Sequence, residues 1–420
     1  MPTGFEIQAT NVDPALLDLP WNLPLEEWPD SLLVALPRGI SRHVVRFVQL
    51  NERVVAVKEI GAPVACHEYV MLRDLSRLNA PSVVPTAVIT GRTDDNGEEL
   101  NAVLITEHLQ FSLPYRALFS RHMAPDTATR LIDALAVLLV RLHLLGFYWG
   151  DVSLSNALFR RDADSFSAYL VDAETGELHP KLTSGQRAYD VDIARTNIIG
   201  ELMDLQAGAF FPEEVDPIHI GDRICSRYKT LWNELTGIEM IDASQKWRVA
   251  QKIERLNELG FDVGEFNMST VAGTSTLKIQ PKVVDAGHHH RKLMRLTGMD
   301  VEENQAQRLL NDIQAFHTAS GRPNSSLELS AHEWLNTAFE PVIAAVPPEF
   351  AGKLEPAQIY HEFLEHRWYL AESAGHDIPL DEAIASYVEN VLAAKRDEAL
   401  YIISESDAEN PTPVANPDLW

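Results

Sequence analysis

The hydrophobic pattern of this chain changes abruptly near Thr127. Before it, short runs rich in Val and Ile are typical of strands, and they cover residues 40–50, 53–60, 83–90 and 101–107. One helical pattern interrupts them, at 67–78. After Thr127, apolar residues recur mostly at helical spacing, which predicts helices at 127–145, 191–206 and 221–235, with a short strand pair at 157–160 and 168–171. This order of elements favours the α+β class.

A second region begins near Gly237, where the preceding helical pattern ends. Beyond it, the periodicity predicts one strand, at 276–284, and helices at 243–259, 301–316, 331–346, 356–374 and 380–400. The tail after Ser404 is acidic and contains several prolines, a composition typical of disorder. We therefore expect an N-terminal extension at 1–37, a first domain at 38–236, a mainly helical C-terminal domain at 237–403 and a disordered acidic tail at 404–420.

Charge and cysteine content exclude several classes of protein. The formal net charge of -26 repels phosphate backbones, so nucleic acid is not an expected partner. The two cysteines, Cys66 and Cys225, form no disulfide framework and suit a reducing compartment. Residues 1–30 lack the pattern of a secretory signal. Charged residues interrupt the longest apolar stretch, 131–145, so we expect a cytoplasmic protein without a membrane span.

The strongest chemical signal lies in the segment GDVSLSN at 150–156, between a long apolar helix and a short strand. Phosphoryl transfer requires a carboxylate that orients or deprotonates the acceptor hydroxyl, and oxygen ligands for magnesium. Asp151 and Asn156, five positions apart on one tight loop, can supply both. Asp172 follows the strand at 168–171 and is the second metal ligand expected on this plan. Taken alone, the Asp and Asn spacing is equally typical of a helix-capping loop.

A lysine and a glutamate upstream extend this set. Lys58 ends the apolar run VVAV and can reach the phosphates of a nucleotide. Its side chain needs an anionic partner. Glu68 is placed to be that partner, because it shares a helical face with Leu72 and Leu75, where a lone carboxylate would be unfavourable. Taken singly, Lys58 is equally an exposed lysine at a strand end and Glu68 a solvated helix charge, so the prediction rests on the whole set.

In this order and context, these residues resemble the protein-kinase-like superfamily, and more specifically its lipopolysaccharide-kinase (Kdo/WaaP-type) branch, over about 38–210. The resemblance implies a two-lobed protein-kinase-like fold, with a small lobe at about 38–110 and a large lobe at about 111–236, followed by the mainly α-helical C-terminal domain. The whole chain, including EW at 333–334 and HRW at 366–368, also resembles the actinobacterial domain-of-unknown-function 4032 family. That second resemblance implies no activity.

The kinase resemblance implies ATP and Mg as cofactors and assigns roles by position. Asp151 would be the catalytic base, and the segment 107–109 would be the hinge that meets the adenine. Asp192 resembles the helix aspartate that braces the catalytic loop. The implied residues are Asp151 and Lys58 for catalysis; Lys58, Glu68, Glu107, Leu109 and Gly39 for the nucleotide; and Asn156, Asp172 and Glu174 for the metal.

Three departures from the kinase pattern bear on activity. Gly39 is the only glycine near the first strand turn, where the family has a glycine-rich loop, so backbone amides there would approach phosphate less closely. Trp149 and Gly150 stand where a histidine and an arginine usually precede the catalytic aspartate. The sequence DAE at 172–174 replaces DFG, and its added carboxylate could hold metal or signal altered chemistry.

The sequence leaves three functions open. The first is ATP- and Mg-dependent phosphoryl transfer to the hydroxyl of an unknown acceptor, a sugar, a lipid precursor or a protein, because fold does not fix substrate. The second is a pseudokinase, a nucleotide-binding regulator or scaffold whose C-terminal domain binds a partner protein. The departures favour it, whereas the retained Lys58, Asp151 and Asn156 disfavour it. The third is adenylyl transfer on the same scaffold.

Three consecutive histidines at 288–290 suggest a metal site. Neighbouring side chains diverge in regular structure, so we expect a solvated loop there instead. The basic residues around it would form a helix face with compensating charge or would bind an anion, and they are Lys278, Lys282, Arg291, Lys292 and Arg295.

The segment HEFLEH at 361–366 resembles a zinc-protease helix, but its histidines are five positions apart rather than four. Two helix-surface pairs are expected instead, His361 with Glu365 and Glu362 with His366. The tryptophans at 334 and 368 are expected as core or interface anchors.

Overall fold

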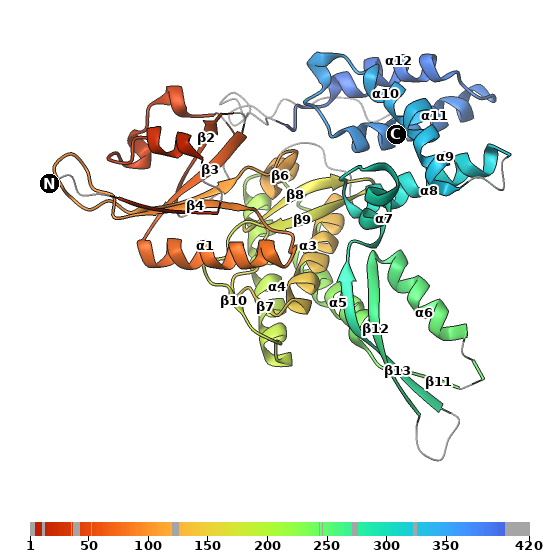
Figure 1. Ribbon diagram of the computed structural model, residues 1–420, viewed down its shortest axis with the longest axis horizontal. Coiled ribbons are helices and arrows are strands. Elements are labelled where there is room, and N and C mark those ends of the chain that lie inside the picture. Colours follow the sequence, from red (N-terminus) through yellow and green to blue (C-terminus); the bar gives the residue numbers. More distant parts are fainter. Residues whose placement is uncertain are drawn as a thin grey trace.

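The computed structural model describes residues 5–10, 13–34, 36, 43–51, 53–119, 126–242, 244–245, 247–270, 276–321 and 326–399. Within these ranges the chain forms a strand-rich lobe, a larger mixed lobe and a helical body toward the C-terminus (Figure 1). The predicted α+β class is confirmed. The tail predicted to be disordered, 404–420, lies outside the described residues.

A five-stranded antiparallel sheet in the order β1-β4-β5-β3-β2 forms the strand-rich lobe. Its strands are β1 (Glu6–Ala9), β2 (Val44–Leu50), β3 (Arg53–Ile60), β4 (Pro85–Thr90) and β5 (Ala102–Glu107). Helix α1 (Ala62–Arg77) packs on β4 and β5. This helix begins before the predicted residue 67. Gly61 is its N-cap and Pro63 lies in its first turn, so the start has no capping side chain that the sequence would reveal. The sequence did not predict β1, which pairs with β4.

Alternation along β3 sends its side chains into two different environments. Val55 and Val57 are buried against the N-terminal segment, whose Trp21 and Trp28 belong to the same apolar cluster. Lys58 directly follows Val57 and points to the opposite face, where it lines a cavity between the lobes. Because side chains alternate along the strand, Lys58 lies in the site described below.

The larger lobe is built around α3 (Thr127–Leu144), whose predicted apolar stripe is buried. The sheet β6-β8-β9, the pair β7-β10 and two long helices surround it. These elements are β6 (Ser112–Pro114), α2 (Tyr115–Phe119), β7 (Phe147–Tyr148), β8 (Ala157–Asp162), β9 (Ser165–Leu170), β10 (Glu177–Leu178), α4 (Ser184–Ala207) and α5 (Pro217–Thr236). Helix α4 begins earlier than the predicted 191, because Thr183 and Gln186 form a capping box.

Beyond Gly237 the chain forms a small antiparallel sheet, in the order β11-β13-β12, and then a group of helices. These elements are β11 (Glu239–Asp242), α6 (Trp247–Glu258), β12 (Phe261–Thr270), β13 (Thr276–Ala286), α7 (His288–Thr297), α8 (Glu303–Ala319), α9 (Leu327–Trp334), α10 (Glu340–Ala344), α11 (Pro356–Ala374) and α12 (Leu380–Asn390). The sequence did not predict β11 or β12. The single helix expected at 331–346 is two helices joined by a π-helical turn, Leu335–Phe339.

Besides the cluster around Trp21 and Trp28, the described residues form two larger apolar cores. The larger core includes Leu235 and extends to Leu256 and Phe261, so the β12–β13 hairpin packs with the first two lobes. The second core runs from Leu293 to Leu392. The predicted domain limits, with a boundary at 236/237, stay predictions. No helix in the part of the chain that the structure describes is long and apolar enough to cross a membrane.

The three consecutive histidines form the first turn of α7, so the prediction of a solvated loop is wrong. The side chain of His288 bonds to Asp262 at 2.5 Å, and that of His289 bonds to Glu303 at 2.8 Å. Neighbouring imidazoles thus face different partners, as the divergence of adjacent side chains implies. No start signal marks this helix in the sequence, because Gly287, at φ 90°, precedes it without a capping side chain.

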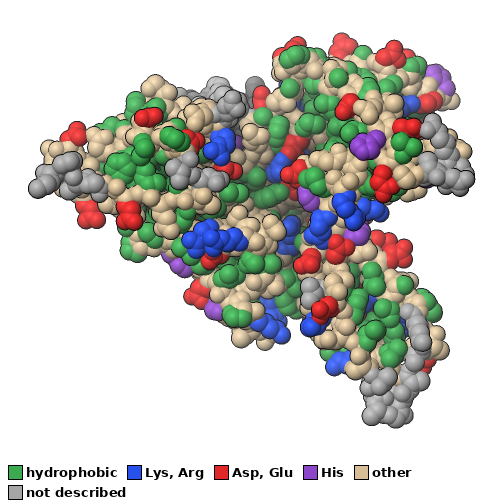
Figure 2. Space-filling model, viewed as in Figure 1, with side chains coloured by type: hydrophobic (Ala, Val, Ile, Leu, Met, Phe, Trp, Pro, Cys, Tyr) green, Lys and Arg blue, Asp and Glu red, His purple; other side chains and the backbone are tan. Residues whose placement is uncertain are grey.

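Basic side chains gather over α7, as Figure 2 shows for the face that includes this helix. Arg291 pairs with Asp262, and Lys282 of β13 pairs with Glu265. Lys292 and Arg295 are exposed on the same helix. Arg291, Lys292 and Arg295 therefore form a helix face with partly compensated charge, one of the two predicted forms, whereas Lys278 and Lys282 lie on β13.

Of the two pairs expected on α11, that of His361 with Glu365 is present, at 3.8 Å. His361 is nevertheless 6% exposed and also meets Asp164 of the larger lobe, so its expected surface position is wrong. Glu362 does not pair with His366, because it accepts a hydrogen bond from Lys395 and His366 bonds to Ser386. Of the two tryptophans, the one at 334 is a fully buried core anchor as predicted, whereas the one at 368 is 58% exposed.

Candidate active site

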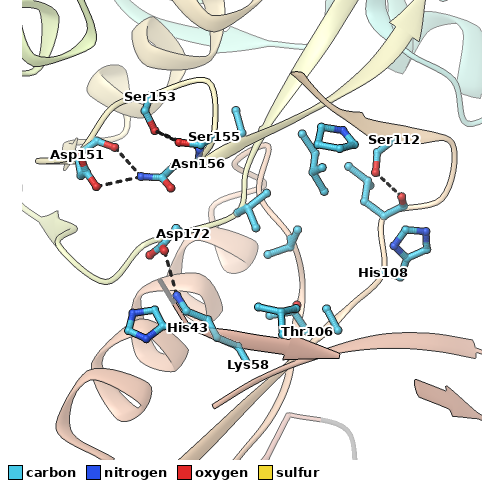
Figure 3. A pocket seen from close by; sticks show the side chains of 18 of the residues that line it. His43, Lys58, Thr106, His108, Ser112, Asp151, Ser153, Ser155, Asn156 and Asp172 are labelled. Atoms are coloured by element: carbon cyan, nitrogen blue, oxygen red, sulfur yellow. Dashed lines mark hydrogen bonds and ion pairs between the residues drawn. The ribbon is translucent and has the colours of Figure 1, made fainter. Parts of the chain in front are cut away.

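A cavity of about 660 Å³ lies between the strand-rich lobe and the larger lobe (Figure 3). Much of its lining is apolar, and the apolar residues include Val45, Ala56, Val83, Leu104, Leu158 and Val171. The polar side chains of Lys58, Asp151 and Asp172 also line it, although they come from three separate segments. An apolar cavity with a few convergent polar groups is the usual form of a small-molecule site.

Lys58 joins two carboxylates from distant parts of the chain. Its Nζ lies 3.0 Å from Glu68 Oε2 on α1 and 3.0 Å from Asp172 Oδ2, which follows β9. Glu174 Oε2 lies 4.0 Å from the same nitrogen. Glu68 is 1% exposed, as its position on the apolar face of the helix implies. The lysine–glutamate pair expected from the sequence is thus present, and Asp172 joins it.

This cluster carries more negative than positive charge. Burial, and next to it the Asp172 carboxylate, raise the pKa of Glu68 to about 7, although Lys58 opposes the shift. Burial acts to lower the pKa of Lys58, but Glu68 and Asp172 outweigh it and hold that pKa above its usual value. One ammonium therefore faces three carboxylates, and a divalent cation beside Asp172 and Glu174 would balance the excess charge.

Two asparagines fix the carboxylate of Asp151. Asn156 Nδ2 donates to Asp151 Oδ2 at 3.1 Å and to its backbone oxygen at 3.0 Å (Figure 3). Asn197 of α4 donates to Oδ1 of the same aspartate at 3.2 Å. These hydrogen bonds therefore fix the orientation of the Asp151 carboxylate through both of its oxygens. Because the amide nitrogen of Asn156 is engaged, its amide oxygen is the donor left for a metal ion.

One face of α4 braces the loop that carries Asp151. Asp190 accepts hydrogen bonds from the backbone amides of 149–150, at 2.9 and 2.8 Å. Glu201 accepts from the amides of 154–155, also at 2.9 and 2.8 Å. Asp190, Asn197 and Glu201 are spaced by seven and four residues, so they lie on one side of the helix. Three polar side chains of one helix thus hold both ends of the loop.

The brace predicted at Asp192 is therefore wrong. Asp192 is exposed and lies two residues from Asp190, about 200° around the helix. Asp190 is fully buried and also bonds to Nε2 of His143 at 3.0 Å. The error follows from the predicted helix start at 191, which left Asp190 outside the helix.

Trp149 joins the loop to the segment that follows β9. Its indole nitrogen donates to the backbone oxygen of Asp172 at 3.1 Å, and its own carbonyl accepts from Thr175 Oγ1 at 2.7 Å. Gly150 has φ 80°, and a Cβ there would lie 3.2 Å from the carbonyl oxygen of Thr175, so a glycine fits where other residues would be strained. The departures at 149 and 150 thus have a structural explanation.

The segment 107–109 connects the lobes at the edge of the cavity, as expected for a hinge. The amides of Glu107 and His108 donate to backbone carbonyls of the strand-rich lobe. In the part of the chain that the structure describes, the amide of Leu109 has no hydrogen-bond partner. The side chain of Glu107 pairs with Arg53 at 3.1 Å, so the amide of Leu109 is the donor of this segment that is available to a ligand.

The structure brings most of the predicted site residues together. Those that line the cavity are Lys58, Glu68, Glu107, Leu109, Asp151, Asn156 and Asp172. Glu174 lies beside it, 4.0 Å from Lys58, whereas Gly39 lies outside the described residues. The sequence reasoning missed His43, which lies 3.4 Å from Glu174, and also Asn197 and Glu201. The helical spacing of 197 and 201 was a usable signal.

The two lobes, the cavity between them and the buried lysine–glutamate pair define a protein-kinase-like domain. Residues 46–197 match the model of the lipopolysaccharide kinase (Kdo/WaaP) family, and residues 230–392 match that of a domain of unknown function, DUF4032. Both predicted resemblances are thus confirmed over these ranges, and so is the two-lobed kinase-like fold followed by a mainly helical C-terminal part.

Other comparisons add little detail. No curated protein matches the chain. Among solved structures, that of "WaaP in complex with acyl carrier protein" is 14% identical, with a TM-score of 0.34 over 55% of this chain and 90% of that chain.

Proposed function

We propose that this protein transfers the γ-phosphate of ATP to a hydroxyl group, with magnesium as cofactor. The observation that carries the proposal is the convergence of Lys58, Asp151 and Asp172 on one cavity. The match of residues 46–197 to a kinase family supports it. The acceptor is left undefined, because one fold hosts many substrates.

The apolar part of the cavity would hold the adenine. The backbone amide of Leu109 would donate to the edge of the base. Lys58 would contact the phosphates, and Glu68 would keep the lysine extended toward them through their 3.0 Å contact. The kinase resemblance also assigns Gly39 to the phosphates.

Asn156, Asp172 and Glu174 would hold the metal. Carboxylate and amide oxygens are the ligands that Mg²⁺ prefers, and the excess of negative charge around Lys58 supports a divalent cation here. When bound, magnesium would neutralise charge on the phosphates during transfer.

Asp151 would orient the acceptor hydroxyl and take its proton. Hydrogen bonds from Asn156 and Asn197 fix its carboxylate, so the acceptor oxygen would meet it in one direction. Ser153 and Thr196 line the cavity nearby, and their hydroxyl groups bond to Ser155 and to the backbone oxygen of Asp192.

Product analysis tests this proposal and separates it from its rivals. The protein is incubated with Mg-ATP and a panel of hydroxyl compounds, and phosphorus NMR follows the nucleotide. Phosphoryl transfer yields ADP, and adenylyl transfer yields pyrophosphate. We expect ADP, and we expect Asp151→Asn to form it at least about 100-fold more slowly while still binding ATP.

Asp192→Asn is the matched control, because Asp192 is an exposed acid of α4 outside the cavity. It is expected to behave as the wild type. Pyrophosphate as the product would replace the proposal with adenylyl transfer. Nucleotide binding without any product would favour the nucleotide-binding regulator instead.

A further inference from the structure

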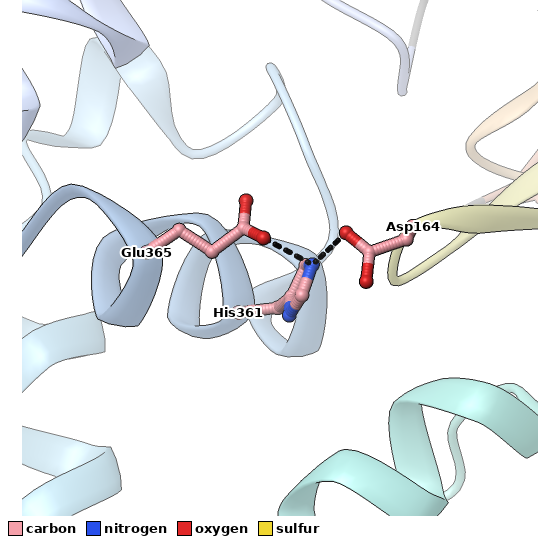
Figure 4. Close-up of side chains that lie close together, drawn as sticks. All are labelled: Asp164, His361 and Glu365. Carbon is pink, nitrogen blue, oxygen red and sulfur yellow. Dashed lines mark hydrogen bonds and ion pairs between the residues drawn. The ribbon is translucent and has the colours of Figure 1, made fainter. Parts of the chain in front are cut away.

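Three side chains of metal-ligating type meet where α11 packs on the turn between β8 and β9 (Figure 4). Asp164 lies in that turn, whereas His361 and Glu365 lie one helical turn apart on α11. Nε2 of His361 is 3.2 Å from Asp164 Oδ1 and 3.8 Å from Glu365 Oε1. One ligand atom from each of the three lies within 4.8 Å of the others.

These separations suit one first-row metal ion. With metal–ligand bonds of about 2.1 Å, two ligand atoms at a tetrahedral angle are about 3.4 Å apart. The 3.2 Å between Asp164 and His361 is close to this value. The 3.8 Å between His361 and Glu365 needs only a small side-chain rotation to reach it.

An ion pair alone explains the arrangement less well. An imidazole nitrogen carries at most one proton, yet the carboxylates of Asp164 and Glu365 both face Nε2 of His361. A protonated His361 can give its one Nε2 proton to only one of the two carboxylates, whereas a metal ion in the same place would bind both. The imidazole itself is 6% exposed, so its nitrogen is buried and aimed into the cluster.

Neighbouring contacts hold the ligands in place. Arg308 of α8 pairs with Oδ2 of Asp164, which leaves Oδ1 directed at His361. Gln358, one turn before His361, is buried and bonds to both the amide and the carbonyl of Ala163, at 3.1 and 3.4 Å. The turn that carries Asp164 is thus fixed to α11, and such contacts orient metal ligands.

We propose that Asp164, His361 and Glu365 bind a divalent transition-metal ion, best matched by Zn²⁺. One imidazole nitrogen and two carboxylate oxygens form a mixed set that Zn²⁺ accepts, whereas Mg²⁺ and Ca²⁺ prefer oxygen alone. Both carboxylates are about half exposed, so water completes the coordination. The ion joins the segment matched by the kinase family to the segment matched by DUF4032.

Calorimetric titration of Zn²⁺ into the full chain tests the proposal. Excess Mg²⁺ is present throughout, so that the acidic groups of the active-site cavity are occupied. We expect Glu365→Gln and Asp164→Asn to weaken Zn²⁺ binding by at least about tenfold. The matched control is Glu372→Gln, which alters an exposed acid of the same helix outside the cluster and is expected to bind Zn²⁺ as the wild type does.

Thermal unfolding gives an independent readout. Zn²⁺ is expected to raise the unfolding midpoint of the wild type and of Glu372→Gln, but not that of Glu365→Gln. Absence of Zn²⁺ binding by the wild type would overturn the proposal. So would equal affinity in the wild type and Glu365→Gln, because the ion would then bind at other histidines, such as His288 and His289. Neither result bears on ATP binding, so this inference and the proposed function fail separately.

Discussion

At the scale of the residue, the burial of Glu68 gives the free energy of unfolding a particular pH dependence. Its pKa is about 7 in the folded protein and close to 4.5 in the unfolded chain, so the folded state holds the proton more tightly. Protonation of Glu68 therefore stabilises the folded state fully below about pH 4.5, and this contribution to the free energy of unfolding is lost as the pH rises through about 7. Glu68→Gln removes this titration.

We therefore expect the free energy of unfolding of the wild type to fall more steeply than that of Glu68→Gln between about pH 5 and about pH 7.5. Urea denaturation at the two pH values measures both slopes. Parallel slopes would mean that Glu68 titrates normally and is not held in the buried cluster.

Gly150 permits a second test at this scale. Gly150→Ala places a side chain at φ 80°, 3.2 Å from a backbone oxygen, and is expected to lower the free energy of unfolding by about 1–2 kcal/mol. Gly185→Ala is the matched control. It lies at the start of α4, where a Cβ meets only Thr183 Oγ1 at 3.9 Å, and is expected to be neutral or slightly stabilising. Thermal denaturation compares the two, and equal losses would contradict this account of residue 150.

The sequence could predict those site residues whose chemistry shows in a short segment. Lys58, Asp151 and Asp172 each follow or precede an apolar run that fixes the position of the charged group. Glu201 and Asp190 could not be placed so directly, because their role depends on which side of α4 faces a loop far away in the sequence. That orientation is set by tertiary packing.

At the scale of the element, α4 positions the loop of Asp151 through one of its faces. Asp190→Asn weakens charge-assisted hydrogen bonds to two buried amides and to His143, and is expected to lower the free energy of unfolding by about 3 kcal/mol. Asp192→Asn, on the opposite side of α4, is expected to change it by less than about 0.5 kcal/mol. Urea denaturation of both variants checks the difference. A larger loss for Asp192→Asn would restore the brace predicted from the sequence.

Elements with strong periodicity were predictable, and weakly patterned ones were not. The apolar stripe of α3 and the helix at 356–374 are present as expected. Strand β12 was missed because it contains Gly264 and several polar residues, and its pairing with β13 shifts register at 263–266. Such a bulged strand has no clean alternation along the sequence.

At the scale of the whole molecule, apolar packing and the family matches divide the chain differently. The DUF4032 match begins at residue 230, yet Leu256 and Phe261 belong to the core of the first two lobes. A fragment 1–287 keeps these contacts, whereas a fragment 1–236 loses them. We expect the unfolding midpoint of 1–287 to be higher by about 6 °C or more, since burial of one large apolar side chain contributes about 3 kcal/mol. Equal midpoints in thermal scans would contradict the packing.

Calorimetric titration of ATP in excess Mg²⁺ tests most directly whether Lys58, Asn156 and Asp172 form one site for a metal-bound nucleotide. We expect the wild type to bind one ATP per chain and Asp172→Ala to bind at least about tenfold more weakly, because Asp172 is a proposed metal ligand. No ATP binding by the wild type, or equal affinity in the two proteins, would contradict the account.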